Sequence, residues 1–165
     1  MHAGTMRPIL ARLILLGVML LCTSCSDYDR RWKSMQSAAT TTDLYAGSYE
    51  GTWESSRYKG ASGKLWCILT LQGPNLYSAE FRATWHGIFS SRHKVQLHVT
   101  SRRGKGSKAV ATFAGAMEIK MWIGSGRYRC DGEVTPRSLV ANYDAEIDRG
   151  KFSLVRVLPT AAKPQ

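Results

Sequence analysis

The chain has 165 residues, of which 44% are hydrophobic and 21% charged, and its 23 Lys and Arg against 12 Asp and Glu give a formal net charge of +11. This length suits one domain, and the ordinary apolar share excludes a wholly disordered chain and a membrane protein with many spans. The 4 Cys are too few for a small disulfide-rich scaffold. The 15 Gly, the 5 Pro and the many β-branched and aromatic residues favour strands and turns.

The beginning of the chain has the pattern of an export signal. Arg7 and Arg12 are followed, without any acidic residue, by the apolar run from Leu13 to Cys22. A basic start and an apolar run of roughly 7–15 residues are typical of a secretory signal, whereas a membrane-spanning helix needs about 20. We therefore predict a signal peptide over residues 1–24 and an exported protein.

The end of the apolar run carries a cysteine preceded by small residues. Thr23 and Ser24 stand directly before Cys25, and polar residues follow. This pattern resembles the lipobox of bacterial lipoproteins, in which the Cys thiol receives a diacylglycerol and becomes the first residue of the mature chain. The resemblance implies lipidation of Cys25, with fatty acids such as palmitate. Cys22 replaces the usual Leu of the lipobox, and is itself a poorer acceptor because the large Leu21 precedes it. Secretion without lipid and an uncleaved N-terminal anchor are the alternatives.

Lipidation implies a location at the bacterial cell envelope, on the periplasmic or extracellular face of a membrane. Two or three acyl chains, at about 0.8 kcal/mol per buried CH₂, would hold the protein there. Residues 25–47 then form a polar tether rich in Ser, Thr and Ala. A short helix around Tyr28 to Met35 is an alternative for part of this tether.

From Ser48 onward, apolar residues recur at every second position. The clearest stretch runs from Leu76 to Trp85, where five apolar residues alternate strictly with polar ones. This period indicates a half-buried strand, and the alternation of large and small buried residues suits the interior of a small barrel. The same period marks residues 64–71, 95–99, 128–134, 139–145 and the segment that begins at Phe152.

Turn signals separate these segments. Clusters of Gly, Pro, Asn and Asp lie at 60–63, 72–75, 103–106, 124–126, 135–136 and 148–150. Their spacing of about 8–15 residues predicts consecutive hairpins. The expected fold is all-β: one antiparallel up-and-down β-barrel of eight or nine strands over residues 48–158, with 159–165 as a C-terminal tail. We prefer a barrel to a sandwich because closure leaves no exposed sheet edge.

Gly51-Thr52-Trp53 in the first predicted strand and Arg156 in the last resemble a signature of the calycin group of barrels, which includes lipocalins, fatty-acid-binding proteins and avidins. The resemblance implies that Gly51, Trp53 and Arg156 close one end of the barrel. A guanidinium over the indole face would contribute about 0.5–2 kcal/mol. The alternative is a buried Trp and an unrelated surface Arg. The order of leader, tether and small all-β domain also resembles that of many bacterial envelope lipoproteins of uncharacterised activity.

No arrangement of reactive residues indicates an enzyme. His93 and His98 are an odd number of residues apart, so they face opposite sides of a strand. The chain has neither a Gly-x-Ser-x-Gly elbow nor a Walker phosphate loop, and the spacing of its carboxylates suggests no glycosidase pair. We therefore predict a protein without catalytic residues, metal or cofactor. Export also argues against nucleic acid as a partner.

Cys67 and Cys130 are both expected to point into the barrel. An oxidising compartment favours a disulfide between them. A bridge, however, needs Cα atoms within about 7 Å, and the two strands are not neighbours in a simple up-and-down order. A disulfide and two buried free thiols therefore both stay open.

The sequence predicts a membrane-anchored binding or structural module of the cell envelope, with two alternatives. The first is a carrier of a small apolar ligand, whose wall would be Tyr77, Phe81, Trp85, Leu97, Val99 and Tyr143, unless these side chains fill the barrel. The second is adhesion to anionic lipid or glycan surfaces through the basic segment 81–117, which has no acidic residue. Its anion contacts would be Arg102, Arg103, Lys105 and Lys108, unless their loop is only a solvated hairpin.

Overall fold

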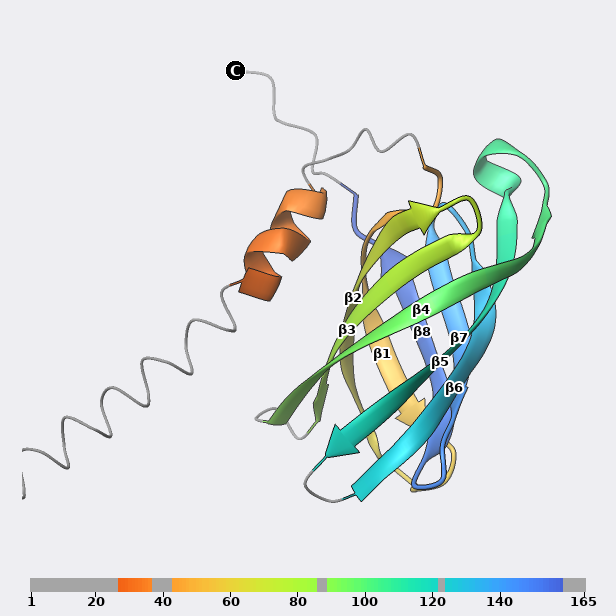
Figure 1. Cartoon of the computed structure of the whole chain (residues 1–165). Helices are drawn as coiled ribbons and strands as arrows, with labels where there is room; N and C mark the ends of the chain where they lie inside the picture. Colours follow the sequence, from red (N-terminus) through yellow and green to blue (C-terminus); the bar gives the residue numbers. More distant parts are fainter. Residues whose placement is uncertain (1–26, 37–42, 86–88, 122–123, 159–165) are drawn as a thin grey trace, which may run out of the picture.

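Eight antiparallel strands close into one barrel, in which each strand pairs with its neighbours along the chain and β1 pairs with β8 (Figure 1). The structure is a computed structural model that describes residues 27–36, 43–85, 89–121 and 124–158. The predicted up-and-down barrel is thereby confirmed. The strands are β1 (Gly47–Ser55), β2 (Ser62–Gly73), β3 (Leu76–Trp85), β4 (Phe89–Arg103), β5 (Val110–Met121), β6 (Gly124–Val134), β7 (Ser138–Asp144) and β8 (Arg149–Arg156).

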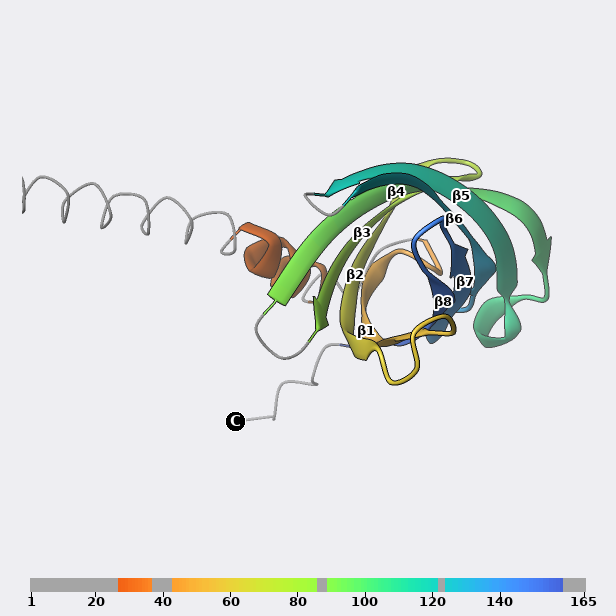
Figure 2. The ribbon, with the colours of Figure 1, turned by 90° about the horizontal axis from the view of Figure 1, so that it is seen from below.

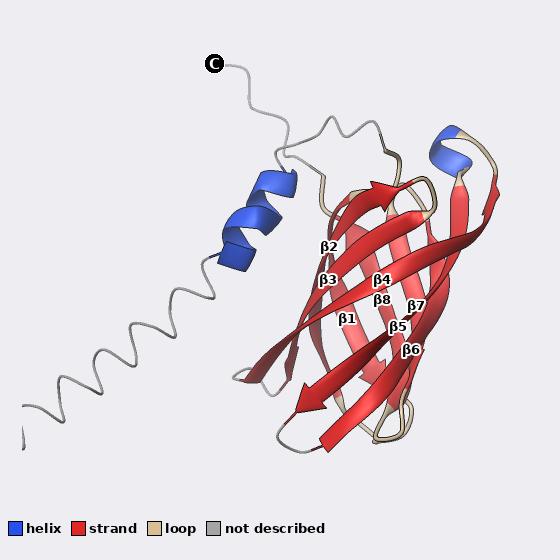
Figure 3. Ribbon diagram, viewed as in Figure 1, coloured by secondary structure: helices blue, strands red, loops and turns tan. Residues whose placement is uncertain are grey.

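Helical structure is a minor part of the described chain (Figure 3). Residues 27–36 form a helix before the barrel, and a single turn, η1 (Gly106–Lys108), lies between β4 and β5. The turn expected at residues 124–126 is wrong, because these residues open β6 and pair with β5. Gly126 does not have a positive φ, so it is compatible with an extended strand.

The alternating pattern decides which side chains face the interior. On β3, Tyr77, Ala79 and Phe81 are buried, and they lie opposite Leu97, Val95 and His93 of β4. Residues opposite each other on neighbouring strands share a face of the sheet, so the inward set continues from strand to strand around the barrel. His98 lies opposite Leu76 and is exposed, so the two histidines of β4 do face opposite sides, as predicted.

A glycine allows β1 and β8 to approach closely at the seam of the barrel. Gly51 lies opposite Leu154, and a Cβ on Gly51 would stand only 2.1 Å from the backbone oxygen of Ser153. Any larger residue would therefore push the two strands apart. Gly51 thus contributes to closure of the barrel at the β1–β8 pair.

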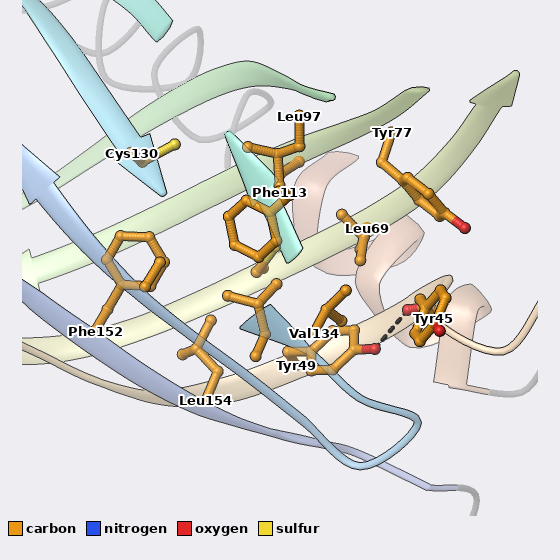
Figure 4. Packing of buried hydrophobic residues seen from close by; sticks show 14 of the residues in the cluster. Tyr45, Tyr49, Leu69, Tyr77, Leu97, Phe113, Cys130, Val134, Phe152 and Leu154 are labelled. Carbon is orange, nitrogen blue, oxygen red and sulfur yellow. Dashed lines mark hydrogen bonds between the residues drawn. The ribbon is translucent and has the colours of Figure 1, made fainter. Parts of the chain in front are cut away.

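The barrel has two different ends, which we call upper and lower from their positions in Figure 1. The β2–β3, β4–β5 and β6–β7 connections lie at the upper end, together with residues 43–46. Tyr45 and Ala46 are buried, and Tyr45 belongs to the barrel core (Figure 4). The β1–β2 and β7–β8 connections lie at the lower end, which Figure 2 shows from below.

Side chains from every strand meet in the interior (Figure 4). Of the expected ligand wall, Tyr77, Phe81 and Leu97 are buried in this core, and Val99 and Tyr143 pack against it. Trp85 is half-buried at the lower end of β3. The residues expected to line a hollow are therefore mostly the residues that fill the upper and middle parts of the barrel.

Candidate functional site

The helix of residues 27–36 lies against the outside of the barrel (Figures 1 and 2). Tyr28 is 1% exposed, and its hydroxyl donates to the backbone oxygen of Glu80 on β3 at 3.4 Å. Ser48 on β1 donates its hydroxyl to the backbone oxygen of Trp32 at 2.8 Å. Burial raises the pKa of Tyr28 above its ordinary value, so this hydroxyl stays protonated. The segment predicted to be a polar tether therefore contains a helix fixed to the barrel, and the alternative of a short helix around Tyr28 to Met35 is confirmed.

Two ion pairs with crossed charges hold the helix in place. Arg31 on the helix contacts Glu80 on β3, with Nη1–Oε2 at 2.6 Å and Nη2–Oε1 at 2.7 Å. Asp29 on the helix accepts from Arg82 on β3, with Nη1–Oδ1 at 2.7 Å. The hydrogen bond with Glu80 raises the pKa of Arg31, which keeps the guanidinium charged. Two-point contact between a guanidinium and a carboxylate fixes distance and angle together.

Arg92 and the ion-paired Arg82 also lie over aromatic rings at this contact. Arg92 of β4 stands 5.6 Å from the centre of the Tyr28 ring, and Arg82 stands 5.7 Å from that of Trp66. Both distances are within the range of cation–π attraction. Arg82 and Arg92 belong to the basic segment 81–117, so part of its charge serves to hold the helix.

The four expected anion contacts are all exposed, and they differ in their partners within the protein. Arg102 stands 5.7 Å from the centre of the Tyr45 ring and donates to the backbone oxygen of Pro74 at 2.7 Å. Arg103 pairs with Glu133 of β6 at 2.6 Å. Lys105 and Lys108 are exposed on the loop around η1. The structure therefore gives the two arginines partners within the protein and leaves the two lysines toward solvent.

Asp43 organises the segment that covers the upper end. Its carboxylate accepts from the backbone N–H groups of Tyr45 at 2.9 Å and Ala46 at 2.7 Å, and from the hydroxyl of Tyr77 at 2.8 Å. Burial and this hydrogen bond raise the pKa of Tyr77 to about 12. Tyr49 in turn donates its hydroxyl to the backbone oxygen of Tyr45 (Figure 4). These contacts hold Tyr45 in the upper opening.

Arg156 also holds the upper end, and it does not cover Trp53 as expected. Its guanidinium donates to the backbone oxygens of Leu44 at 2.9 Å and of Ala46. Arg156 lies opposite Tyr49, whereas Trp53 lies opposite Phe152, four residues away along β8. At about 3.3 Å per residue, the two positions are roughly 13 Å apart along the strand. Both lie at the β1–β8 seam, but Arg156 is near the upper end and Trp53 nearer the lower end.

The interior becomes more polar and more exposed toward the lower end. Trp53, Ala83, Met117 and Tyr143 are only partly buried where they pack against the core. A Cβ on Gly126, on the inward side of β6, would meet no atom within 4 Å, so there is open space beside it. We call this region the lower mouth.

Polar groups are built into the lower mouth. His93 points inward, and its Nε2 lies 2.9 Å from the hydroxyl oxygen of Ser91. Burial lowers the pKa of His93, so the imidazole is neutral at neutral pH. Asp148 accepts from the hydroxyls of Ser55 at 2.6 Å and Tyr143 at 2.9 Å. Sequence reasoning missed this cluster, although Ser91 and His93 both occupy inward-facing positions of β4.

Aromatic rings connect the lower mouth to the core. The ring centres of Tyr128 and Tyr143 are 6.4 Å apart, those of Tyr143 and Phe152 are 6.3 Å apart, and those of Phe152 and Phe81 are 5.2 Å apart. Such separations are typical of favourable aromatic pairs. The lower mouth therefore presents flat apolar surfaces beside a neutral imidazole and hydroxyl groups.

Cys67 on β2 and Cys130 on β6 are buried and free in the structure. Burial raises the pKa of both thiols, that of Cys130 to about 11. Thiols that stay protonated at neutral pH are poor nucleophiles and poor metal ligands.

Cys25 and the predicted signal peptide lie outside the described residues. Within the described ranges, no group of three His, Cys, Asp or Glu side chains is arranged to hold a metal ion. In the same part of the chain, no helix has both the length and the apolar character needed to cross a bilayer. Comparisons of this chain with protein-family models, curated proteins and solved structures gave no match.

Proposed function

We propose that this protein is an exported lipoprotein, held on a membrane of the bacterial cell envelope through Cys25, and that its β-barrel is a non-enzymatic binding or structural module. The observation that supports this proposal is the docked helix. Its described part starts at residue 27, two residues after the lipobox-like cysteine, and ion pairs fix it to β3. An anchor at Cys25 would therefore hold the barrel at the membrane with little free chain between them.

Metabolic labelling tests this attachment. Cells that express the full chain are grown with an alkyne-tagged fatty acid, and the label on the protein is read after cell fractionation. We expect the wild type and Cys22→Ser to carry the label and to fractionate with membranes, whereas Cys25→Ser loses the label. Retention of the label in Cys25→Ser, or its loss in Cys22→Ser, contradicts lipidation at Cys25.

Binding of a small apolar ligand at the lower mouth is the second candidate function. The partly buried Trp53, Met117 and Tyr143 favour it, because small-molecule sites combine apolar walls with a few polar groups. The polar groups here are His93, Ser91 and the hydroxyl of Tyr143. The upper end is covered by Tyr45, so a ligand would enter from below and would stay shallow.

Native mass spectrometry and uptake of a fluorescent fatty acid test the second candidate. We expect the purified protein to carry or take up the ligand, and Ala83→Phe to prevent uptake because position 83 faces the lower mouth. Ala116→Phe is the matched control, since Ala116 is exposed on the outside of β5. Absence of a bound molecule together with absence of uptake by the wild type rules this function out.

A further inference from the structure

The face around the docked helix carries a surplus of positive charge. We define the docking face as the helix of residues 27–36 with the adjacent outer side of β3 and β4. Its described basic side chains outnumber its acidic ones by six to three: Arg30, Arg31, Lys33, Arg82, Arg92 and Lys94 against Asp27, Asp29 and Glu80. Every one of these acids is within an ion pair with an arginine of the same face. All three carboxylates of this face are therefore already paired, and an excess of positive charge remains.

The basic side chains of the docking face differ in their exposure. Arg82 is 24% exposed in its ion pair with Asp29, and it serves to hold the helix. Arg30 is 74% exposed, and Lys33 and Lys94 are also exposed. Lys94 lies opposite Glu80, the partner of Arg31, and is therefore beside the helix. Arg30, Lys33 and Lys94 are the positive charges that a partner approaching this face would meet.

We propose that the docking face lies against the anionic lipid headgroups of the membrane that carries the protein, so that the barrel rests on its side. The proposal depends on the membrane attachment proposed above. Only Ser26 stands between Cys25 and residue 27 of the helix, and this length of chain spans less than about 10 Å, which is close to the distance over which a charged surface acts at physiological salt. Each Lys or Arg near an anionic bilayer strengthens the attachment roughly fivefold.

In this orientation a second basic cluster, the loop around η1 with Lys105 and Lys108, stays away from the membrane. The η1 turn with Lys108 lies on the side of the barrel away from the helix in both views (Figures 1 and 2). A flat bilayer that contacts the docking face cannot reach this loop at the same time. The two clusters therefore give opposite results in a footprinting experiment.

Lysine footprinting on vesicles tests the orientation. The full-length protein is reconstituted into vesicles of phosphatidylcholine alone or with added phosphatidylglycerol, treated briefly with acetic anhydride, and analysed by peptide mass spectrometry. We expect Lys33 and Lys94 to be acetylated severalfold more slowly in the anionic vesicles, and Lys105 and Lys108 to be unaffected. High salt should remove the protection, because the Debye length falls to about 3 Å at 1 M.

Charge reversal supplies the matched control. Lys33→Glu/Lys94→Glu should abolish the protection of Arg30 against phenylglyoxal on anionic vesicles, and Lys105→Glu/Lys108→Glu should leave it unchanged. Both double variants change the net charge equally. Equal modification of Arg30 in the two variants contradicts the proposal that the docking face contacts anionic lipid.

The remaining outcomes are distinguishable from a failure of the anchor. Equal acetylation in both kinds of vesicle, or protection of the loop lysines instead, overturns the docking face even when Cys25 carries its fatty-acid label. Equal protection by a soluble acidic polysaccharide overturns lipid as the partner. Absence of the label from Cys25 overturns the proposed attachment, whatever the footprint shows.

Discussion

Arg31 and Glu80 are 49 residues apart in the sequence and meet through two short hydrogen bonds in the structure. Beside them, the charges are exchanged, because Asp29 on the helix pairs with Arg82 on the barrel. A helix lying in the opposite direction would place like charges opposite each other. The crossed pairs therefore specify the direction of the helix as well as its position.

A double-mutant cycle on Arg31→Gln and Glu80→Gln should give a coupling energy of about 1–2 kcal/mol in urea unfolding, because the pair is two-pronged and Glu80 is only 18% exposed. The matched cycle on Arg103→Gln and Glu133→Gln should give less than about 0.5 kcal/mol, since both of those side chains are largely exposed. Equal coupling energies in the two cycles would show that the helix contact is an ordinary surface pair.

Gly51→Ala should lower the free energy of unfolding by about 3 kcal/mol or more, because the new methyl group would collide with the backbone of β8. Gly126→Ala is the control, since its added methyl group meets open space and should change stability by less than about 0.5 kcal/mol. Chemical denaturation of both variants decides the matter. A Gly51→Ala variant as stable as the control would mean that the seam is wider than described.

The stability of the barrel should decrease in mild acid because of His93. Burial lowers the pKa of this imidazole in the folded protein, whereas in the unfolded chain it is about 6.5. The unfolded state therefore binds more protons below that pH, and the free energy of unfolding falls as pH decreases. His93→Gln should reduce this dependence between pH 7 and pH 5, and His98→Gln on the exposed side of β4 should retain it. Identical pH profiles for wild type and His93→Gln would contradict the burial of a neutral imidazole.

Cys67 and Cys130 should resist alkylation by iodoacetamide at neutral pH without reductant, because both thiols are buried and their pKa values are raised. Both should react after denaturation. Peptide mass mapping distinguishes this result from a disulfide, which would appear as one cross-linked peptide pair that only reductant separates.

The alternation of apolar and polar residues predicts some strands and not others, for a physical reason. The predicted segment from Leu76 to Trp85 coincides with β3, because large apolar residues alternate there with polar ones. β5 carries no such contrast, since its inward Gly115 is small and the outward Ala114 and Ala116 are apolar. Burial in β5 is imposed by its neighbours, and its own sequence period does not reveal it.

The candidate sites depend on pairings that no local pattern contains. Nothing near Asp29 indicates that Arg82 will face it, because the contact requires the register of the barrel and the position of the helix together. The same holds for Arg156, whose distance from Trp53 follows from the β1–β8 register. Asp148 belongs to the turn signal at 148–150, and nothing in that signal indicates that the β7–β8 connection turns it toward Ser55 and Tyr143.

Because the first strand, β1, pairs with the last strand, β8, the two ends of the barrel's chain lie side by side. The backbone N–H of Val157, just after β8, donates to the backbone oxygen of Ser48 at the start of β1, at 2.9 Å. A short linker could therefore join the two ends of the barrel, and new termini could be opened in the exposed β1–β2 connection without removing any strand pair. Circular permutation would thus move the point to which the docked helix is attached while leaving the neighbours of every strand unchanged.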